Sequence, residues 1–267
     1  KSKGNVVFAD ELAEIFGVDG VRYYALSEMP YNSDGSITYE SVISRYNNDL
    51  ANNLGNLVSR THAMTKKYFD GVVRAPGKEE DIDAQLKSAV KEGIEKSLKL
   101  MNEYHVADSL DEIFAVLRRA NKYIDETMPW ALAKDESKKD RLNDVLYNLS
   151  EAIVCGASLL SPFMPETSGK ILAAFGAKER SFEECERFGL AEQVTAYTVP
   201  PLFARLDFKA LQPKIEAIQK AQVEAYLKEN PQEKEEKKEE KKVEEGKEEE
   251  LISIDDFGKV ELQVGEL

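Results

Sequence analysis

The sequence predicts a mainly α-helical protein whose largest part is a helical bundle. Of its 267 residues 42% are hydrophobic, which is enough for one good-sized core. From residue 37 onward, apolar residues recur at spacings of three and four, the period of an amphipathic helix. Burying each large apolar side chain is worth about 1.5 to 3 kcal/mol, so these helices are expected to pack against one another.

The first segment, residues 1–35, predicts a polar loop, a short strand and two helices. KSKGNVV is the loop that runs into the strand, and ADELAEIF predicts a helix that stops at Gly17. Asp19 is the expected N-cap of a second helix over VRYYAL, which the turn residues of MPYNSDGS end. A segment of this size cannot bury a core of its own, so we expect it to belong to something larger.

The helical bundle is expected over residues 36–206. Its clearest boundary signal is Ser109 with Glu112, which have the S-x-x-E order of a capping box and predict a helix start at Ser109. Pro129 ends that helix. Three further apolar stripes are Tyr39, Val42, Ile43, Tyr46, Leu50, Leu54 and Leu57; Leu86, Val90, Ile94, Leu98 and Met101; and Leu142, Val145, Leu146, Leu149 and Ile153.

After the bundle, the pattern predicts one more amphipathic helix, over residues 207–228, and then a charged tract. Residues 229–250 contain eleven Glu and six Lys. Like charges repeat at every fourth position, as in Glu235 and Glu239, and would repel each other on a helix. We therefore expect 229–250 to be a disordered linker.

Composition limits the classes of protein that the chain can represent. No apolar run of about eighteen residues and no secretion signal is present, so we expect a cytoplasmic protein without a membrane partner. Cys155 and Cys185 lack CxxC spacing and lie far in sequence from His62 and His105, so neither a disulfide nor a metal site is expected. Cys155 is expected in the core, and both histidines are expected to be ordinary helix residues.

The net charge of -14 opposes general affinity for phosphates. Any contact with a nucleic acid must therefore be a local patch. No Ser/His/Asp or Cys/His set has an interpretable spacing, and no catalytic residue is assigned. KSKGN at the start has ammonium groups, a hydroxyl and a glycine that could surround a polyphosphate, although a lysine-rich start is also commonly just solvated.

Two other patterns suit the binding of an unstacked base. Asn56 and Arg60 lie four apart on a polar helix stripe that also holds Asp49 and Asn53, and their amide and guanidinium groups suit the Watson-Crick edge of a base. An ordinary solvated helix face explains the same spacing.

The second of these patterns is Pro129 followed by Trp130, the only tryptophan, at a helix break. A rigid turn there could present the indole ring as a stacking platform for a base. A tryptophan in the core is the alternative, and the sequence leaves both readings open.

Several segments resemble the methionyl-tRNA synthetase family along nearly the whole chain. KSKGNVV resembles the end of the KMSKS signature of class I synthetases. GVDGVRYYAL, DGSITYESVISRYNNDLANNLGNLVSR and MPWALAK resemble the segments that join the catalytic domain to the anticodon-binding bundle. LISIDDFGKVELQVGEL, residues 251–267, resembles the start of an appended tRNA-binding OB-fold domain.

This resemblance implies a role for each candidate residue. Lys1 and Ser2 would belong to the ATP site, while Asn56 and Arg60 would recognise the anticodon. Pro129 with Trp130 would stack on the anticodon. Residues 1–35 would be a short α/β remnant of the catalytic and stem-contact region, and 36–206 the α-helical anticodon-binding domain.

The resemblance also implies the activity of a full-length enzyme, a methionine-tRNA ligase that joins methionine to tRNA(Met) using ATP and Mg2+. The chain alone is expected to be inactive, because the nucleotide-binding fold and any zinc-binding insertion would lie upstream of Lys1. The appended domain would mediate a homodimer. Two alternatives remain open: part of another class I synthetase, or a non-enzymatic helical scaffold that binds tRNA or protein.

Overall fold

The computed structural model describes residues 8–28, 37–197 and 201–229. The chain divides into two compact units, residues 7–212 and residues 1–6 with 213–267. The bundle and the candidate site lie in the larger unit. The helix α11 (Phe208–Glu229), predicted over 207–228, begins in the larger unit and continues into the other.

Some expectations fall outside the described residues. They are the roles of Lys1 and Ser2, the strand in KSKGNVV, the charged linker beyond Glu229 and the OB-fold segment 251–267.

The first two helices form as predicted, except for one cap. Helix α1 (Ala9–Phe16) ends at Gly17, whose φ of 73° favours glycine, and α2 (Val18–Glu28) follows. The expected N-cap role of Asp19 is wrong, since this residue lies inside α2 and is buried. Its carboxylate accepts a hydrogen bond of 2.6 Å from the backbone N–H of Thr167, in the first turn of α9 (Pro165–Ala174). It therefore caps a helix distant in sequence.

A continuous helical rod carries the first apolar stripe. It comprises α3 (Tyr39–Arg45), the π-helical segment η1 (Tyr46–Gly55) and α4 (Asn56–Phe69), and its backbone stays helical across both junctions. Thr38 caps the start of the rod, where its side chain accepts a hydrogen bond from the backbone N–H of Ser41. π-helical turns are rare and frequently occur at functional sites. Here the π-segment ends directly before Asn56.

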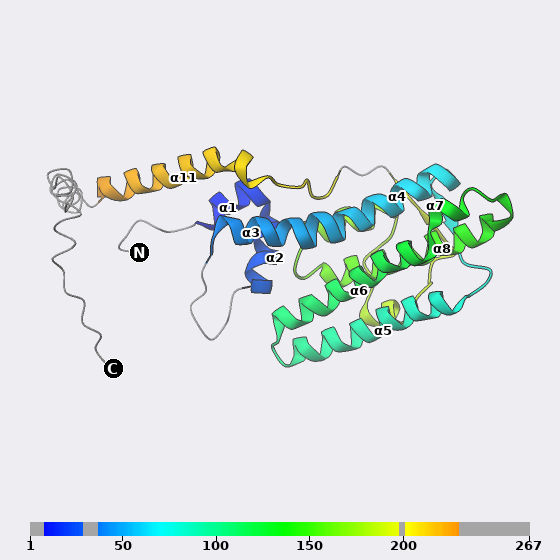
Figure 1. Cartoon of the computed structure of the whole chain (residues 1–267). Coiled ribbons are helices and arrows are strands. Elements are labelled where there is room, and N and C mark those ends of the chain that lie inside the picture. The colour runs from blue at the N-terminus through cyan, green and yellow to red at the C-terminus, as the bar shows by residue number, and fades with distance from the viewer. Residues whose placement is uncertain (1–7, 29–36, 198–200, 230–267) are drawn as a thin grey trace, which may run out of the picture. The chain divides into compact units, whose positions relative to one another are not determined.

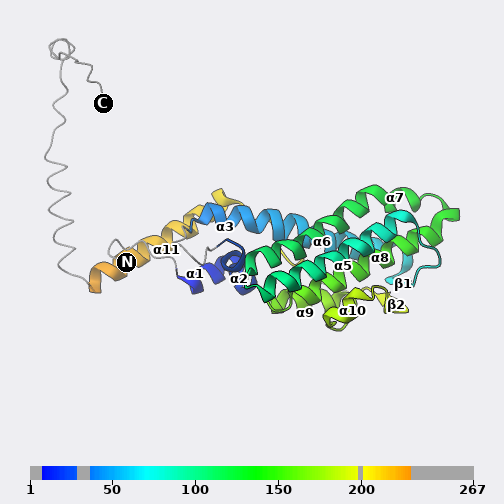
Figure 2. The ribbon, with the colours of Figure 1, turned by 90° about the horizontal axis from the view of Figure 1, so that it is seen from below.

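The rest of the bundle packs beside this rod (Figure 1). Helices α5 and α6 form a hairpin, α7 is a short turn after α6, and α8 returns along α6. Helices α9 and α10 and the strands β1 and β2 lie along one side of the bundle (Figure 2). The bounds are α5 (Asp81–Asn102), α6 (Val106–Thr127), α7 (Pro129–Leu132), η2 (Glu136–Lys138), α8 (Lys139–Leu160), α10 (Phe182–Glu186) and the antiparallel strands β1 (Val72–Arg74) and β2 (Gln193–Thr195).

The predicted mainly helical bundle is confirmed, and the apolar stripes lie in its core except at the end of the second one, where Met101 is exposed. Leu50, Leu86 and Leu146, one from each stripe, are fully buried. In the described part of the chain, no helix is long and apolar enough to cross a bilayer.

The predicted start of α6 is wrong. This helix begins at Val106, three residues before Ser109, which is buried inside it. The Ser109 hydroxyl donates a hydrogen bond of 3.0 Å to the carbonyl of Ser97 on α5 and lies 2.8 Å from the Ser97 hydroxyl. A partner on the neighbouring helix thus satisfies the hydroxyl that the capping-box pattern assigned to a helix end.

The close approach of α5 and α6 gives a first prediction. Gly93→Ala is expected to lower the free energy of unfolding by about 1 to 3 kcal/mol, because overpacking forces neighbouring atoms to shift. An added Cβ would lie 2.3 Å from Cγ2 of Val116 on α6. Urea unfolding measures the effect.

The control is Gly169→Ala on the exposed face of α9, where nothing lies within 4 Å of an added Cβ. This change is expected to stabilise the helix by about 0.5 to 1 kcal/mol. Equal free-energy changes for the two substitutions would contradict the packing of α5 on α6.

Candidate functional site

The candidate site lies where α4 meets the break between α6 and α7. Met128 has a left-handed backbone (φ 46°) that ends α6, and the buried Pro129 begins α7. This turn leaves Trp130 41% exposed. The Arg60 guanidinium lies 5.7 Å from the centroid of the Trp130 ring, a cation–π distance. Two candidate residues far apart in the sequence are thus neighbours on one surface.

Asp125, on α6, forms an ion pair with the Arg60 side chain. Its Oδ1 lies 3.2 Å from Nη2 of Arg60. Both side chains are partly exposed, so this ion pair adds little stability, but it orients the guanidinium beside the indole ring. Sequence reasoning missed Asp125. Its position one turn before a Pro-Trp helix break was the available signal.

Asparagines extend the polar surface along α4 and η1. Asn56 is exposed, one turn before Arg60, and its side chain has no hydrogen-bond partner among the described residues. Asn121 on α6 donates from Nδ2 to the carbonyl of Asn53 at 3.1 Å and to its Oδ1 at 2.7 Å. The free amide of Asn56 and the guanidinium of Arg60 therefore follow, along the same rod, a contact with α6 that two amides hold together.

Asp49, the fourth residue of the predicted polar stripe, contacts residues outside this surface. Its Oδ2 accepts a hydrogen bond of 2.9 Å from the Tyr23 hydroxyl and lies 3.0 Å from Nε of Arg45. Burial, followed by the nearby Asp49 carboxylate, raises the pKa of Tyr23 far above its usual range. Asp49 therefore links α2 to η1 and does not join the Arg60–Trp130 surface.

A buried polar cluster fixes the helices that flank α7. Asp83 on α5 accepts two hydrogen bonds from Arg141 on α8, of 2.5 and 2.9 Å, and one from the Tyr123 hydroxyl on α6. Burial opposes the charge of Asp83, yet the hydrogen bonds from Arg141 and Tyr123 outweigh it and hold the pKa of this carboxyl below its usual value. The ends of α6 and α8 are thereby tied together on either side of Trp130.

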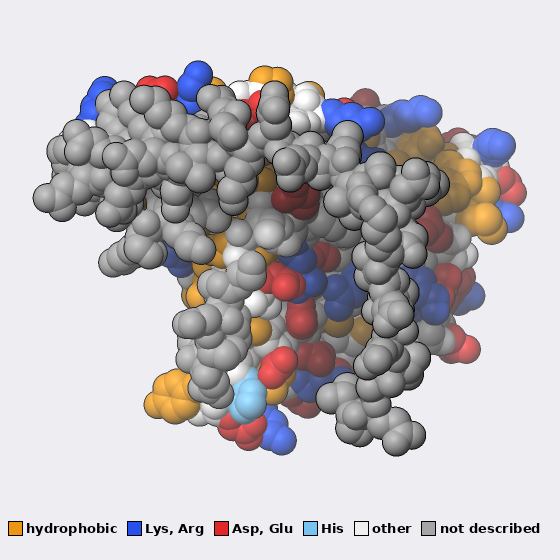
Figure 3. All heavy atoms as spheres, turned by 60° about the vertical axis from the view of Figure 1, so that its left-hand side comes forward, with side chains coloured by type: hydrophobic (Ala, Val, Ile, Leu, Met, Phe, Trp, Pro, Cys, Tyr) orange, Lys and Arg blue, Asp and Glu red, His pale blue; other side chains and the backbone are white. Residues whose placement is uncertain are grey.

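On the described part of the face that Figure 3 displays, acidic, basic and hydrophobic side chains are interspersed. Within the described ranges, no group of three or more His, Cys, Asp or Glu side chains could hold a metal ion.

The prediction that Cys155 is a core residue is confirmed, and Cys185 is buried beside it. The hydrogen bond with Cys185, and then burial, raise the pKa of Cys155. These thiols therefore form no part of the candidate site.

Two family models match the chain. Residues 1–62 match the class I tRNA synthetases (M), and residues 73–212 match the anticodon binding domain of methionyl tRNA ligase. The Trp130 turn lies in the second match and Arg60 at the end of the first.

Curated relatives are similar over the whole chain. The methionine--tRNA ligase of Caldanaerobacter subterraneus subsp. tengcongensis is 43% identical over 100% of this chain and 39% of its own length. That of Clostridium tetani is 45% identical over 99% of this chain and 38% of its own length. The chain thus spans about two-fifths of these relatives.

Solved structures agree with the sequence comparisons. Mycobacterium tuberculosis methionyl-tRNA synthetase in its free state is 36% identical with a TM-score of 0.70, and bound by methionyl-adenylate it is 36% identical with a TM-score of 0.72. Each match covers 76% of this chain and 41% of the other.

Proposed function

This chain belongs to the methionyl-tRNA synthetase family, and from that premise we propose that its helical bundle reads the anticodon of tRNA(Met). The observation that carries the proposal is the pairing of Arg60 with the exposed ring of Trp130, one helical turn from the free amide of Asn56. An aromatic face, a fork of donors and an amide with both a donor and an acceptor suit an unstacked base.

Each group has a separate part in this recognition. An anticodon base stacks on the indole of Trp130, and stacking of this kind is worth about 1 to 3 kcal/mol whatever the base. Selectivity comes from hydrogen bonds to base edges, which Arg60 and Asn56 provide. The Asp125 carboxylate and the Trp130 ring hold the guanidinium of Arg60 in one orientation before the tRNA arrives. A group held in place in advance loses less freedom on binding.

The whole ligase, on this proposal, attaches methionine to tRNA(Met) with ATP and Mg2+. ATP and the metal ion supply the activation of the methionine carboxylate. Lys1 and Ser2 are the residues of this chain that we assign to ATP. The bundle itself contributes by holding the anticodon, and so by choosing which tRNA is charged.

Arg60→Lys tests the role of the guanidinium fork. Lysine keeps the positive charge but cannot make two parallel hydrogen bonds, so we expect it to lose about 1 kcal/mol of discrimination between anticodons. Binding is measured with anticodon stem-loops that carry CAU or a changed first base.

The control is Arg118→Lys on the exposed surface of α6, where one guanidinium nitrogen donates to the carbonyl of Asp111 at 3.3 Å. This variant should discriminate as the wild type does. The role of Arg60 would be contradicted if both variants lost the same amount of discrimination between the two loops. It would also be contradicted if neither Arg60→Lys nor the wild type distinguished the loops.

A further inference from the structure

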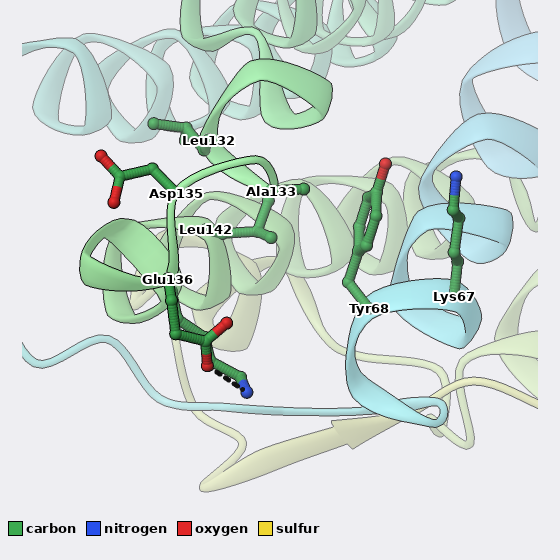
Figure 4. A pocket seen from close by; sticks show the side chains of 8 residues that line it. Lys67, Tyr68, Leu132, Ala133, Asp135, Glu136 and Leu142 are labelled. Atoms are coloured by element: carbon green, nitrogen blue, oxygen red, sulfur yellow. Dashed lines mark hydrogen bonds and ion pairs between the residues drawn. The ribbon is translucent and has the colours of Figure 1, made fainter.

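A small pocket opens further along α4 than Arg60, between that helix and the chain that follows Trp130. It has a volume of about 170 Å³ and lies between the last turn of α4 and the chain that leads from α7 into α8 (Figure 4). Lys67 follows Arg60 by seven residues, or two helical turns, on the same side of α4, about 10.5 Å along the axis. The residues that line the pocket are Lys67, Tyr68, Leu132, Ala133, Asp135, Glu136, Lys139 and Leu142.

We propose that this pocket binds a pyrimidine base of the anticodon loop, from the nucleotide on the 5′ side of the anticodon. The inference rests on the proposed function, because the same tRNA loop must lie on Trp130. It adds a second subsite, in which Tyr68 is the aromatic partner.

The size of the pocket suits a single ring. A cavity of about 150 Å³ accommodates benzene, so 170 Å³ is enough for the single ring of a pyrimidine. In tRNA anticodon loops, the nucleotide before the anticodon is a pyrimidine and the nucleotide after it is a purine. The anticodon bases themselves are assigned to the Arg60–Trp130 surface, so of the two nucleotides that flank them the 5′ neighbour is the one that fits.

The aromatic ring of Tyr68 is placed to contact such a base. In Figure 4 the ring stands between Lys67 on one side and Ala133 with Leu142 on the other. The Lys67 ammonium lies 5.2 Å from the ring centroid, so it occupies one face of the ring. The other face of the ring is on the side of Ala133 and Leu142, where a second ring can stack.

The charges of the pocket suit an uncharged base rather than a phosphate. Its lining holds two ammonium groups, Lys67 and Lys139, and two carboxylates, Asp135 and Glu136. Lys139 and Glu136 pair at 2.9 Å, so the local charge is balanced. A pyrimidine edge carries both hydrogen-bond donors and acceptors, and carboxylates and ammonium groups can satisfy both kinds.

The test combines changes in the protein with changes in the RNA. The full chain and its Tyr68→Leu variant are titrated with a CAU stem-loop and with the same loop made abasic at the nucleotide 5′ of the anticodon. Tyr68→Leu should weaken binding of the intact loop about 5- to 100-fold. The abasic loop should lose a similar factor with wild type, and the variant should bind this loop no more weakly than wild type does.

Two further variants distinguish a loss of binding at the pocket from a general loss of structure. Ala133→Leu narrows the pocket without removing the ring and should weaken the intact loop but not the abasic loop. Tyr104→Leu changes a tyrosine that is 88% exposed at the α5–α6 hairpin and should bind as wild type does. Unchanged binding by Tyr68→Leu, or equal losses on both loops, would overturn the proposal.

A CAU loop and a loop with a changed first base, titrated with wild type in the same series, separate this inference from the proposed function. Discrimination between them with no effect of Tyr68→Leu would refute the pocket alone. Equal binding of both loops would refute the reading of the anticodon itself.

Discussion

Arg180→Met is expected to lower the free energy of unfolding by about 3 to 5 kcal/mol, because it leaves a buried carboxylate without its charged partner. Glu151 is fully buried on α8, and Arg180 donates to both of its oxygens at 2.7 Å. The backbone N–H of Gly189 is its third donor, at 2.9 Å. Urea unfolding followed by circular dichroism measures the loss.

The double variant Arg180→Met with Glu151→Leu is the matched control. It removes both charges, so most of the stability should return, since an apolar pair of similar volume is often as stable as a buried ion pair. If Arg180→Met is as stable as wild type, Glu151 is not held buried and dependent on Arg180 as the structure describes. If the double variant is no more stable than the single one, the lost free energy of unfolding comes from changed packing and not from the unpaired charge.

Trp130→Ala is expected to cost about 1 to 3 kcal/mol of tRNA affinity and to leave the thermal midpoint nearly unchanged. The ring is 41% exposed, so its removal opens no large cavity. A tryptophan packed in the core would instead cost about 3 to 5 kcal/mol of stability. The two readings that the sequence leaves open thus predict losses in different measurements, binding and melting.

Filter binding with the CAU stem-loop, together with thermal melts, distinguishes these outcomes for Trp130. Tyr104→Ala is the control, because it removes an exposed aromatic ring from the α5–α6 hairpin, at the other end of α6. We expect it to change neither quantity. A large drop in melting temperature with unchanged binding by Trp130→Ala would make Trp130 a structural residue.

The helical stripes could be predicted because one physical effect dominates them. A residue such as Leu50 or Leu146 has no alternative to burial, so a repeat of three and four specifies both the helix and its inner face. The start of α6 could not be predicted in this way. Ser109 carries a capping pattern, but its hydroxyl finds a partner on α5, and a local pattern contains no information on that contact.

The candidate site was only partly accessible to sequence reasoning. The helix break at Pro129 and the polar spacing of Asn56 and Arg60 could be read from the chain. Their convergence could not, because the packing of α4 beside α6 and α7 decides it, and only the family resemblance pointed to it. Asp125 was missed because an acidic residue on a helix surface is ordinary until its partner is known.

The most direct test of anticodon reading is the affinity of the unmodified full chain for two stem-loops, one with the anticodon CAU and one with its first base changed. We predict that CAU binds more tightly by about 1 to 3 kcal/mol, roughly 5- to 100-fold, because a hydrogen-bonded base edge discriminates by that amount. Equal affinity for the two loops would contradict the account, since a surface that contacts only phosphates and stacks any base carries no sequence information.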